Sequence, residues 1–240
     1  MQIEYNNLAK KIQVSSVNST KRTSQRFSSK MTEGGGQMHL YFLRHGRSAA
    51  DDEQRHEGRY DSPLTPMGKK QVRERAKKLR AQGLSFDRII TSPLKRALET
   101  ANIMGEMLNS KVETMEDWIE FDNGALAGLN YEEAQKRFPK PAFRNPYQRI
   151  ANGTGESDFQ LHSRAMRALE NVMQYQRGRY LIVAHGGILN AAIRMALGIN
   201  PPVGRCGVFF NLGFTGYLHL VYESDTHTWL VNEFNPGYSK

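Results

Sequence analysis

Two histidines in this chain each follow a short apolar run and stand directly before a glycine. His45 precedes Gly46, and His185 precedes Gly186. A neutral imidazole is a good nucleophile near pH 7, because its unperturbed pKa is about 6.5. Both histidines are therefore candidates for nucleophilic chemistry, provided that the fold brings them to one site.

Cleavage of a phosphate ester without a metal ion needs groups that the sequence also offers. Fixed donors must neutralise the phosphoryl oxygens, and the planar fork of arginine suits that role. Arg44 directly precedes His45, and Arg96 is predicted in the first turn of a helix, whose N-terminus attracts anions. The leaving alkoxide needs a proton from an acid. Glu120 is the candidate acid, since its apolar sequence neighbours favour a protonated carboxyl group.

The hydrophobic pattern predicts the elements that position these residues. Apolar runs predict strands at residues 39–43, 88–91, 180–184, 208–210, 217–222 and 229–231. Helices are predicted after the capping residues Thr65 and Ser92, and over residues 159–175 and 188–197. This alternation predicts an α/β fold, a three-layer sandwich with a mainly parallel central sheet and helices on both faces. Ligands bind such sheets at the carboxyl ends of the strands, where His45 and His185 would meet.

Further motifs follow in order along the chain. They are Asp61-Ser62-Pro63-Leu64-Thr65 with Gly68, Thr91-Ser92-Pro93-Leu94 with Arg96, Glu120-Phe121-Asp122-Asn123-Gly124, and Gly155-Glu156-Ser157 with Arg164. Together with the two histidine motifs, they resemble the histidine phosphatase superfamily, in its phosphoglycerate-mutase-like branch. The resemblance extends from about Met38 to the C-terminal strands.

This resemblance implies a role for each candidate residue. His45 would be the nucleophile that becomes phosphorylated. Arg44, Arg96 and His185 would form the phosphate pocket, with His185 also part of the catalytic set. Glu120 would protonate the leaving group and later activate water. Ser92 and Asn190 are close enough to these motifs in sequence to line the pocket, without an assigned role.

The chain departs from the family pattern at the expected rim of the pocket. Arg47 follows His45-Gly46 where the family commonly has Glu, Gln or Asp, and residues 48–52 contain no asparagine. Glu57 replaces a common glutamine. These changes bear on substrate choice more than on the chemistry. Specificity is predicted in the segment 131–157, with Arg137, Lys140, Arg144 and Arg149 as candidate contacts for additional anionic groups.

The predicted function is hydrolysis of small phosphomonoesters through a phosphohistidine on His45, with no metal and no cofactor. His45, His185 and Glu120 lack the short helical spacing that is typical of zinc motifs. A cofactor-dependent phosphoglycerate mutase is the alternative, although the short segment between Glu120 and Gly155 favours a phosphatase. A non-catalytic binding protein on the same fold is a third alternative.

The composition of the chain indicates which partners it could bind and where in the cell it could be located. The chain has 33 Lys and Arg against 24 Asp and Glu, a net charge of +9, which suits an anionic partner. A small phosphorylated substrate is expected, without nucleic acid or membrane, and a homodimer is compatible with the sequence. Residues 1–37 are predicted to be a disordered basic leader, and residues 38–240 the catalytic domain. A cytoplasmic location is expected, or an organellar one if the leader is a transit peptide.

Overall fold

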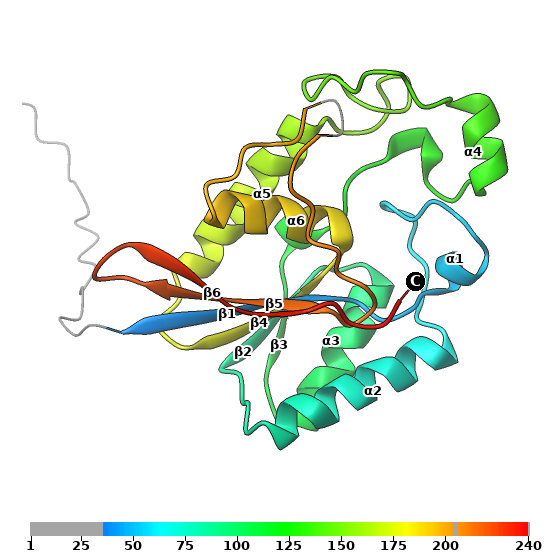
Figure 1. Cartoon of the computed structure of the whole chain (residues 1–240). Helices are drawn as coiled ribbons and strands as arrows, with labels where there is room; N and C mark the ends of the chain where they lie inside the picture. Colours follow the sequence, from blue (N-terminus) through cyan, green and yellow to red (C-terminus); the bar gives the residue numbers. More distant parts are fainter. Residues whose placement is uncertain (1–35, 204–205, 240) are drawn as a thin grey trace, which may run out of the picture. The chain divides into compact units, whose positions relative to one another are not determined.

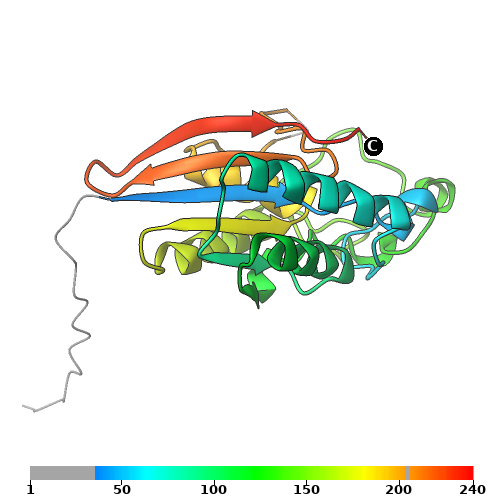
Figure 2. The same cartoon turned by 90° about the horizontal axis from the view of Figure 1, so that it is seen from below.

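A computed structural model describes residues 36–203 and 206–239. Within these residues six strands form one sheet, in the order β3-β2-β4-β1-β5-β6 (Figures 1 and 2). The strands are β1 (Gln37–Arg44), β2 (Arg88–Thr91), β3 (Val112–Thr114), β4 (Arg179–Ala184), β5 (Tyr217–Glu223) and β6 (Thr228–Asn235). The leader predicted over residues 1–37 lies outside the described residues, except for its last two positions.

The sheet is parallel over the part that carries the candidate site. Strands β3, β2, β4 and β1 are parallel neighbours, whereas β5 pairs antiparallel with β1, and β6 antiparallel with β5. The predicted α/β sandwich is therefore confirmed, with an antiparallel hairpin added at one edge of its parallel strands.

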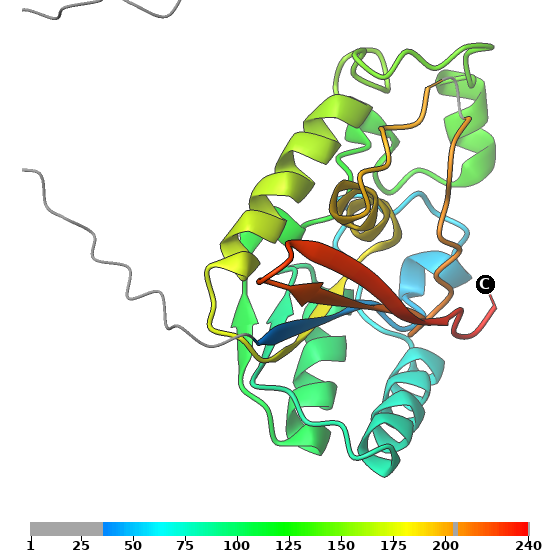
Figure 3. The same cartoon turned by 60° about the vertical axis from the view of Figure 1, so that its left-hand side comes forward.

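Helices cover both faces of the sheet (Figure 3). Helices α2 (Pro66–Ala81) and α3 (Lys95–Leu108) pack on one face, and α5 (Asp158–Met173) and α6 (Gly186–Ala196) on the other. Side chains of β1 alternate between the two cores, with Phe42 on the α5 and α6 side and Leu43 on the α2 and α3 side. Burial of both faces explains why β1 and β4 read as nearly continuous apolar runs.

Short helical elements complete the described part of the chain. They are α1 (Ala49–Asp52), η1 (Glu116–Trp118), η2 (Gly124–Leu126) and α4 (Tyr131–Arg137). None of the helices in residues 36–203 and 206–239 combines the length and apolar character that a membrane span needs.

Two local predictions are wrong for identifiable reasons. Residues 208–210 form no strand, and the N–H and the carbonyl of Phe210 bond to the Asn190 side chain where a strand would pair with its neighbour. Ser92 does not cap α3, which begins at Lys95. The backbone N–H of Lys95 instead donates to the Asp61 carboxylate at 2.7 Å, so a residue distant in sequence occupies the capping position.

Candidate active site

The carboxyl ends of two parallel strands bring the two predicted histidines together. Arg44 of β1 lies opposite Ala184 of β4, so His45 and His185 leave the sheet at the same height. The backbone N–H of His45 donates a hydrogen bond of 3.0 Å to the Ala184 carbonyl. Both imidazole rings are buried, and their centroids lie 5.1 Å apart. The strand register therefore creates one site from two distant parts of the sequence.

Two contacts define which nitrogen of His45 carries the proton. Its Nδ1 lies 2.7 Å from the carbonyl oxygen of Gly46, which can only accept a hydrogen bond. The Nε of Arg96, which can only donate, lies 3.3 Å from Nε2 of the same ring. His45 is therefore held with hydrogen on Nδ1 and an electron pair on Nε2. A nucleophilic histidine needs this form.

Arg96 lies in the first turn of α3, as predicted, and its side chain is fully buried. Nη1 donates to the Tyr60 carbonyl at 2.9 Å, and Nη2 donates to the Gly58 carbonyl at 2.8 Å. Gly58 has a φ of +48°, and a β-carbon there would meet the Asn123 side chain at 1.9 Å, so this turn requires glycine. The two carbonyls fix the guanidinium with its Nε directed at His45.

Two buried groups of the predicted phosphate pocket have a nitrogen without a hydrogen-bond partner among the described residues. Arg44 donates through Nη1 to the Leu212 carbonyl at 3.1 Å, and its guanidinium lies over the Phe214 ring, but its Nε is unpartnered. His185 contacts the Ser92 hydroxyl through Nε2 at 2.8 Å, and its Nδ1 is unpartnered. Such buried atoms are rare in proteins, so these two are candidate contacts for the oxygens of an anion.

Glu120 lies at the N-terminus of α6, and the apolar environment predicted for it is wrong. Its carboxylate accepts hydrogen bonds from the backbone N–H groups of Gly187 and Ile188, both at 3.0 Å, and from that of Phe121 at 2.7 Å. A β-carbon on Gly187 would lie 2.6 Å from Oε1, so glycine lets the carboxylate approach the start of the helix this closely. The start of the helix that follows His185 therefore holds the carboxylate.

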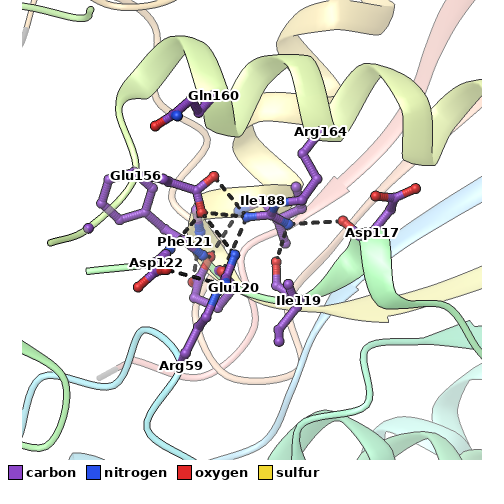
Figure 4. Close-up of polar contacts among 12 residues, drawn as sticks. Arg59, Asp117, Ile119, Glu120, Phe121, Asp122, Glu156, Gln160, Arg164 and Ile188 are labelled. Carbon is purple, nitrogen blue, oxygen red and sulfur yellow. Dashed lines mark hydrogen bonds and ion pairs between the residues drawn. The ribbon is translucent and has the colours of Figure 1, made fainter. Parts of the chain in front are cut away.

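A buried ion pair fixes the backbone that carries Glu120 (Figure 4). The Arg164 guanidinium contacts the two Glu156 carboxylate oxygens at 3.1 and 2.8 Å, and it donates to three backbone carbonyls within residues 117–120. Glu156 also accepts the backbone N–H of Asp122 at 2.7 Å. Glu156 and Arg164, which the motifs include without a role, thus hold the chain on both sides of Glu120.

The sequence profile of the histidine phosphatase superfamily (branch 1) matches residues 40–233 of the chain. The match begins inside β1 and ends inside β6, so it includes both histidines and all the groups around them. The chain belongs to the histidine phosphatase superfamily. This membership confirms the family predicted from the motifs, and it supports the predicted class of enzyme, a phosphatase.

Relatives within the histidine phosphatase superfamily carry both phosphatase and mutase names. The chain is 35% identical over 160 residues to “Uncharacterized phosphatase PhoE” of Bacillus subtilis, covering 66% of this chain and 77% of that protein. It is 34% identical over 173 residues to the 2,3-bisphosphoglycerate-dependent phosphoglycerate mutase of Bradyrhizobium diazoefficiens, covering 68% and 82% respectively. The structure of a mycobacterial glucosyl-3-phosphoglycerate phosphatase complexed with VO3 shares the fold, with a TM-score of 0.68, 23% identity, and coverage of 82% and 99%.

Burial and neighbouring cations determine the protonation of the histidine pair. Removal from water lowers the pKa of His45 well below 6.5, and the charges of Arg96 and Arg44 lower that pKa further. The hydrogen bond to the Gly46 carbonyl acts in the opposite direction but does not outweigh them. Burial, followed by the charge of Arg96, also lowers the pKa of His185 well below 6.5. Both imidazoles are therefore neutral at pH 7.

We expect both imidazoles to stay neutral in a titration down to about pH 6. An unperturbed histidine would be about three-quarters protonated there, whereas a lowered pKa moves protonation to more acidic solution. Histidine-selective ¹⁵N NMR of the full-length protein measures the protonation and the tautomer together, and spectra of His45→Ala and His185→Ala assign the two signals. A titration midpoint at or above pH 6.5 for either ring would contradict this prediction.

A cavity of about 1070 Å³ has Glu57, Glu120 and Gly187 in its lining, and Glu57 also lies 3.8 Å from Nε2 of His45. The predicted specificity segment, residues 131–157, supplies much of its wall. Apolar lining residues from that segment include Phe138, Phe143 and Ile150. The cavity therefore offers apolar as well as polar surface to the part of a ligand that extends beyond the site.

Three of the four cations predicted to contact additional anionic groups line this cavity: Lys140, Arg144 and Arg149. Arg144 is paired with Asp158 at 2.5 Å, and Arg149 donates to the Gly155 carbonyl at 2.5 Å. Lys140 makes no hydrogen bond or ion pair with the residues that the structure describes, which leaves its charge available to a ligand. Arg137 lies outside the cavity lining and pairs with Glu133 of α4 at 3.0 Å.

The residues at the predicted rim have more specific contacts than the sequence indicated. Arg47 forms an ion pair with Asp52, which is on the surface. Glu57 lies beside Arg96 and His45, well inside the predicted rim. In the sequence, Glu57 stands out only as the replacement of a common glutamine. Its position beside Arg96 depends on the path of a loop, and such a path leaves no periodic pattern in the sequence.

Proposed function

We propose that this protein hydrolyses small phosphomonoesters through a phosphohistidine intermediate on His45, without a metal ion or cofactor. The observation that carries the proposal is the form of His45, a buried ring whose Nε2 electron pair faces Arg96 at 3.3 Å. Within residues 36–203 and 206–239, no group of three or more His, Cys, Asp or Glu side chains is arranged as a metal site. The substrate is a small phosphorylated molecule, in keeping with the phosphatase names among the relatives.

In the first step, Arg44, Arg96 and His185 bind the phosphoryl oxygens while Nε2 of His45 attacks phosphorus. The phosphorus–oxygen ester bond breaks, and Glu120 protonates the leaving alkoxide with the proton that its carboxylate takes from water in the preceding turnover. The fixed donors offset the charge on the phosphoryl oxygens in the transition state, which is the main contribution available to a protein in phosphoryl transfer.

In the second step, the Glu120 carboxylate takes a proton from a water molecule whose oxygen attacks phosphorus. The phosphorus–nitrogen bond breaks, and its electron pair returns to Nε2 of His45. Inorganic phosphate leaves, and Glu120 is again a carboxylic acid. Each turnover thus consumes one phosphomonoester and one water and releases one alcohol and one phosphate.

The proposal is tested by measuring phosphate release from a panel of phosphomonoesters, with a chelator present throughout. Turnover of any member would establish hydrolysis that needs no added metal, and the ranking would narrow the substrate class. A parallel assay of exchange between 3- and 2-phosphoglycerate tests the mutase alternative, which the mutase among the relatives supports. Exchange without net phosphate release would replace the hydrolytic proposal with the mutase.

We expect Glu120→Gln to slow release of an alkoxide leaving group by about 10²- to 10⁴-fold, because glutamine cannot donate the proton. The effect on p-nitrophenyl phosphate should be much smaller, since p-nitrophenolate leaves without protonation. Single-turnover release of the leaving group measures this step alone. The matched control is Glu116→Gln, an exposed carboxylate on η1. Equal losses on both substrates would assign the acid to another group.

A cytoplasmic location and a homodimeric state stay predictions from the sequence.

A further inference from the structure

The carboxylate of Glu57 lies next to both Arg96 and His45. Its Oε1 lies 3.2 Å from Nε of Arg96, and its Oε2 lies 3.8 Å from Nε2 of His45. The side chain is only 15% exposed. The proposed nucleophile and one of the proposed phosphate ligands therefore share a negatively charged neighbour.

Hydrogen bonds hold this carboxylate in place. The hydroxyl of Ser48, a fully buried residue, lies 2.5 Å from Oε1 of Glu57 and 2.8 Å from Oδ2 of Asp51, and these two carboxylates share its single proton. Ser48 is itself fixed by the Asp51 carboxylate, which accepts its backbone N–H at 3.0 Å. The backbone carbonyl of Glu57 accepts the N–H of Tyr60 at 2.7 Å. Glu57 is thus an ordered part of the site.

Because of the contacts that Arg96 makes, the position of Glu57 affects how a phosphoryl group can bind. Nη1 of the Arg96 guanidinium donates to the Tyr60 carbonyl, and Nη2 donates to the Gly58 carbonyl. Its Nε contacts both Nε2 of His45 and Oε1 of Glu57. A phosphoryl group that approaches Nε2 of His45 and Nε of Arg96 must come within a few ångströms of the carboxylate. At such distances and in a partly buried site, repulsion between like charges is substantial.

The geometry points to Glu57 as a built-in anion that competes with the phosphoryl group for Arg96. The inference rests on the proposed function, because it takes Arg96 and His45 as the phosphate site. It predicts that Glu57 weakens the binding of phosphate and other oxyanions and so limits inhibition by the inorganic phosphate that the reaction releases. Glutamine in the same place keeps the shape and removes the competing charge.

The test is calorimetric titration of inorganic phosphate into the full-length protein and its Glu57→Gln variant. We expect the variant to bind phosphate about tenfold more tightly, since it loses one nearby negative charge. Glu53→Gln is the matched control, because it removes the same charge from an exposed side chain that pairs with Arg55. Its dissociation constant should stay within about twofold of the wild-type value. The KM for p-nitrophenyl phosphate should fall in Glu57→Gln alone.

Unchanged or weaker phosphate binding in Glu57→Gln would overturn the inference, and so would an absence of measurable binding in both proteins. Glu57→Ala, which also removes the charge, decides the question if the glutamine variant fails to fold. Binding is measured without turnover, so the two proposals fail separately. A wild-type protein that binds phosphate but hydrolyses no phosphomonoester refutes the proposed function, whereas normal hydrolysis with unchanged binding in Glu57→Gln refutes only the competing role of Glu57.

Discussion

Replacing His45 with alanine is expected to lower kcat for p-nitrophenyl phosphate by at least about 10⁴-fold, as removal of a catalytic nucleophile generally does. No other imidazole in the described residues can substitute for it. His185 is the nearest candidate, but its Nε2 contacts the Ser92 hydroxyl at 2.8 Å, and its Nδ1 is proposed to donate a hydrogen bond to a phosphoryl oxygen, which leaves that nitrogen no electron pair for attack. Steady-state phosphate release measures the loss, and a radiolabelled substrate shows whether a phosphoenzyme forms.

Measuring both phosphoenzyme formation and phosphate binding distinguishes loss of the nucleophile from damage to the pocket. His45→Ala should form no acid-labile, base-stable phosphoenzyme, yet it should still bind inorganic phosphate through Arg44 and Arg96. His227→Ala, a change at an exposed histidine between β5 and β6, is the control and should behave like the wild-type protein. Retention of wild-type activity or of the labelled phosphoenzyme in His45→Ala would refute the proposed mechanism.

The meeting of the two histidines could be predicted from the sequence because it follows from local rules. β1 and β4 are apolar runs, and each ends directly before a histidine and a glycine. Parallel strands in one sheet present their carboxyl ends on the same edge. Only the adjacency of β1 and β4 was needed to place His45 beside His185, and the first-turn position of Arg96 follows from the strand and helix pattern in the same way.

Contacts made by loops could not be predicted, because their partners lie far away in the sequence. The environment of Glu120 depends on the N-terminus of α6, and the backbone around it depends on the Glu156–Arg164 pair. The apolar residues beside Glu120 in the sequence do not determine what surrounds its carboxylate. Glu57 reaches Arg96 for the same kind of reason, through a loop whose shape has no periodic signal.

Arg96→Ala is expected to lower kcat/KM by about 10³-fold, through both a higher KM and a lower kcat. The guanidinium is a proposed phosphate ligand, so its loss weakens substrate binding. It also contacts Nε2 of His45 and anchors the Gly58 and Tyr60 carbonyls, so its loss disturbs the position of the nucleophile. Arg73→Ala, which removes an exposed arginine of α2, is the control and should leave both constants unchanged.

Two further measurements separate the charge of Arg96 from its geometry. Arg96→Lys restores the positive charge but cannot reach two carbonyls and His45 with one ammonium group, so it should recover only part of the lost activity. Added guanidinium should partly rescue Arg96→Ala and leave His45→Ala inactive. A higher KM with unchanged kcat in Arg96→Ala would mean that the guanidinium binds substrate and transition state equally. That result would remove Arg96 from the positioning of His45 and leave the Gly46 carbonyl as the contact that fixes the reactive tautomer.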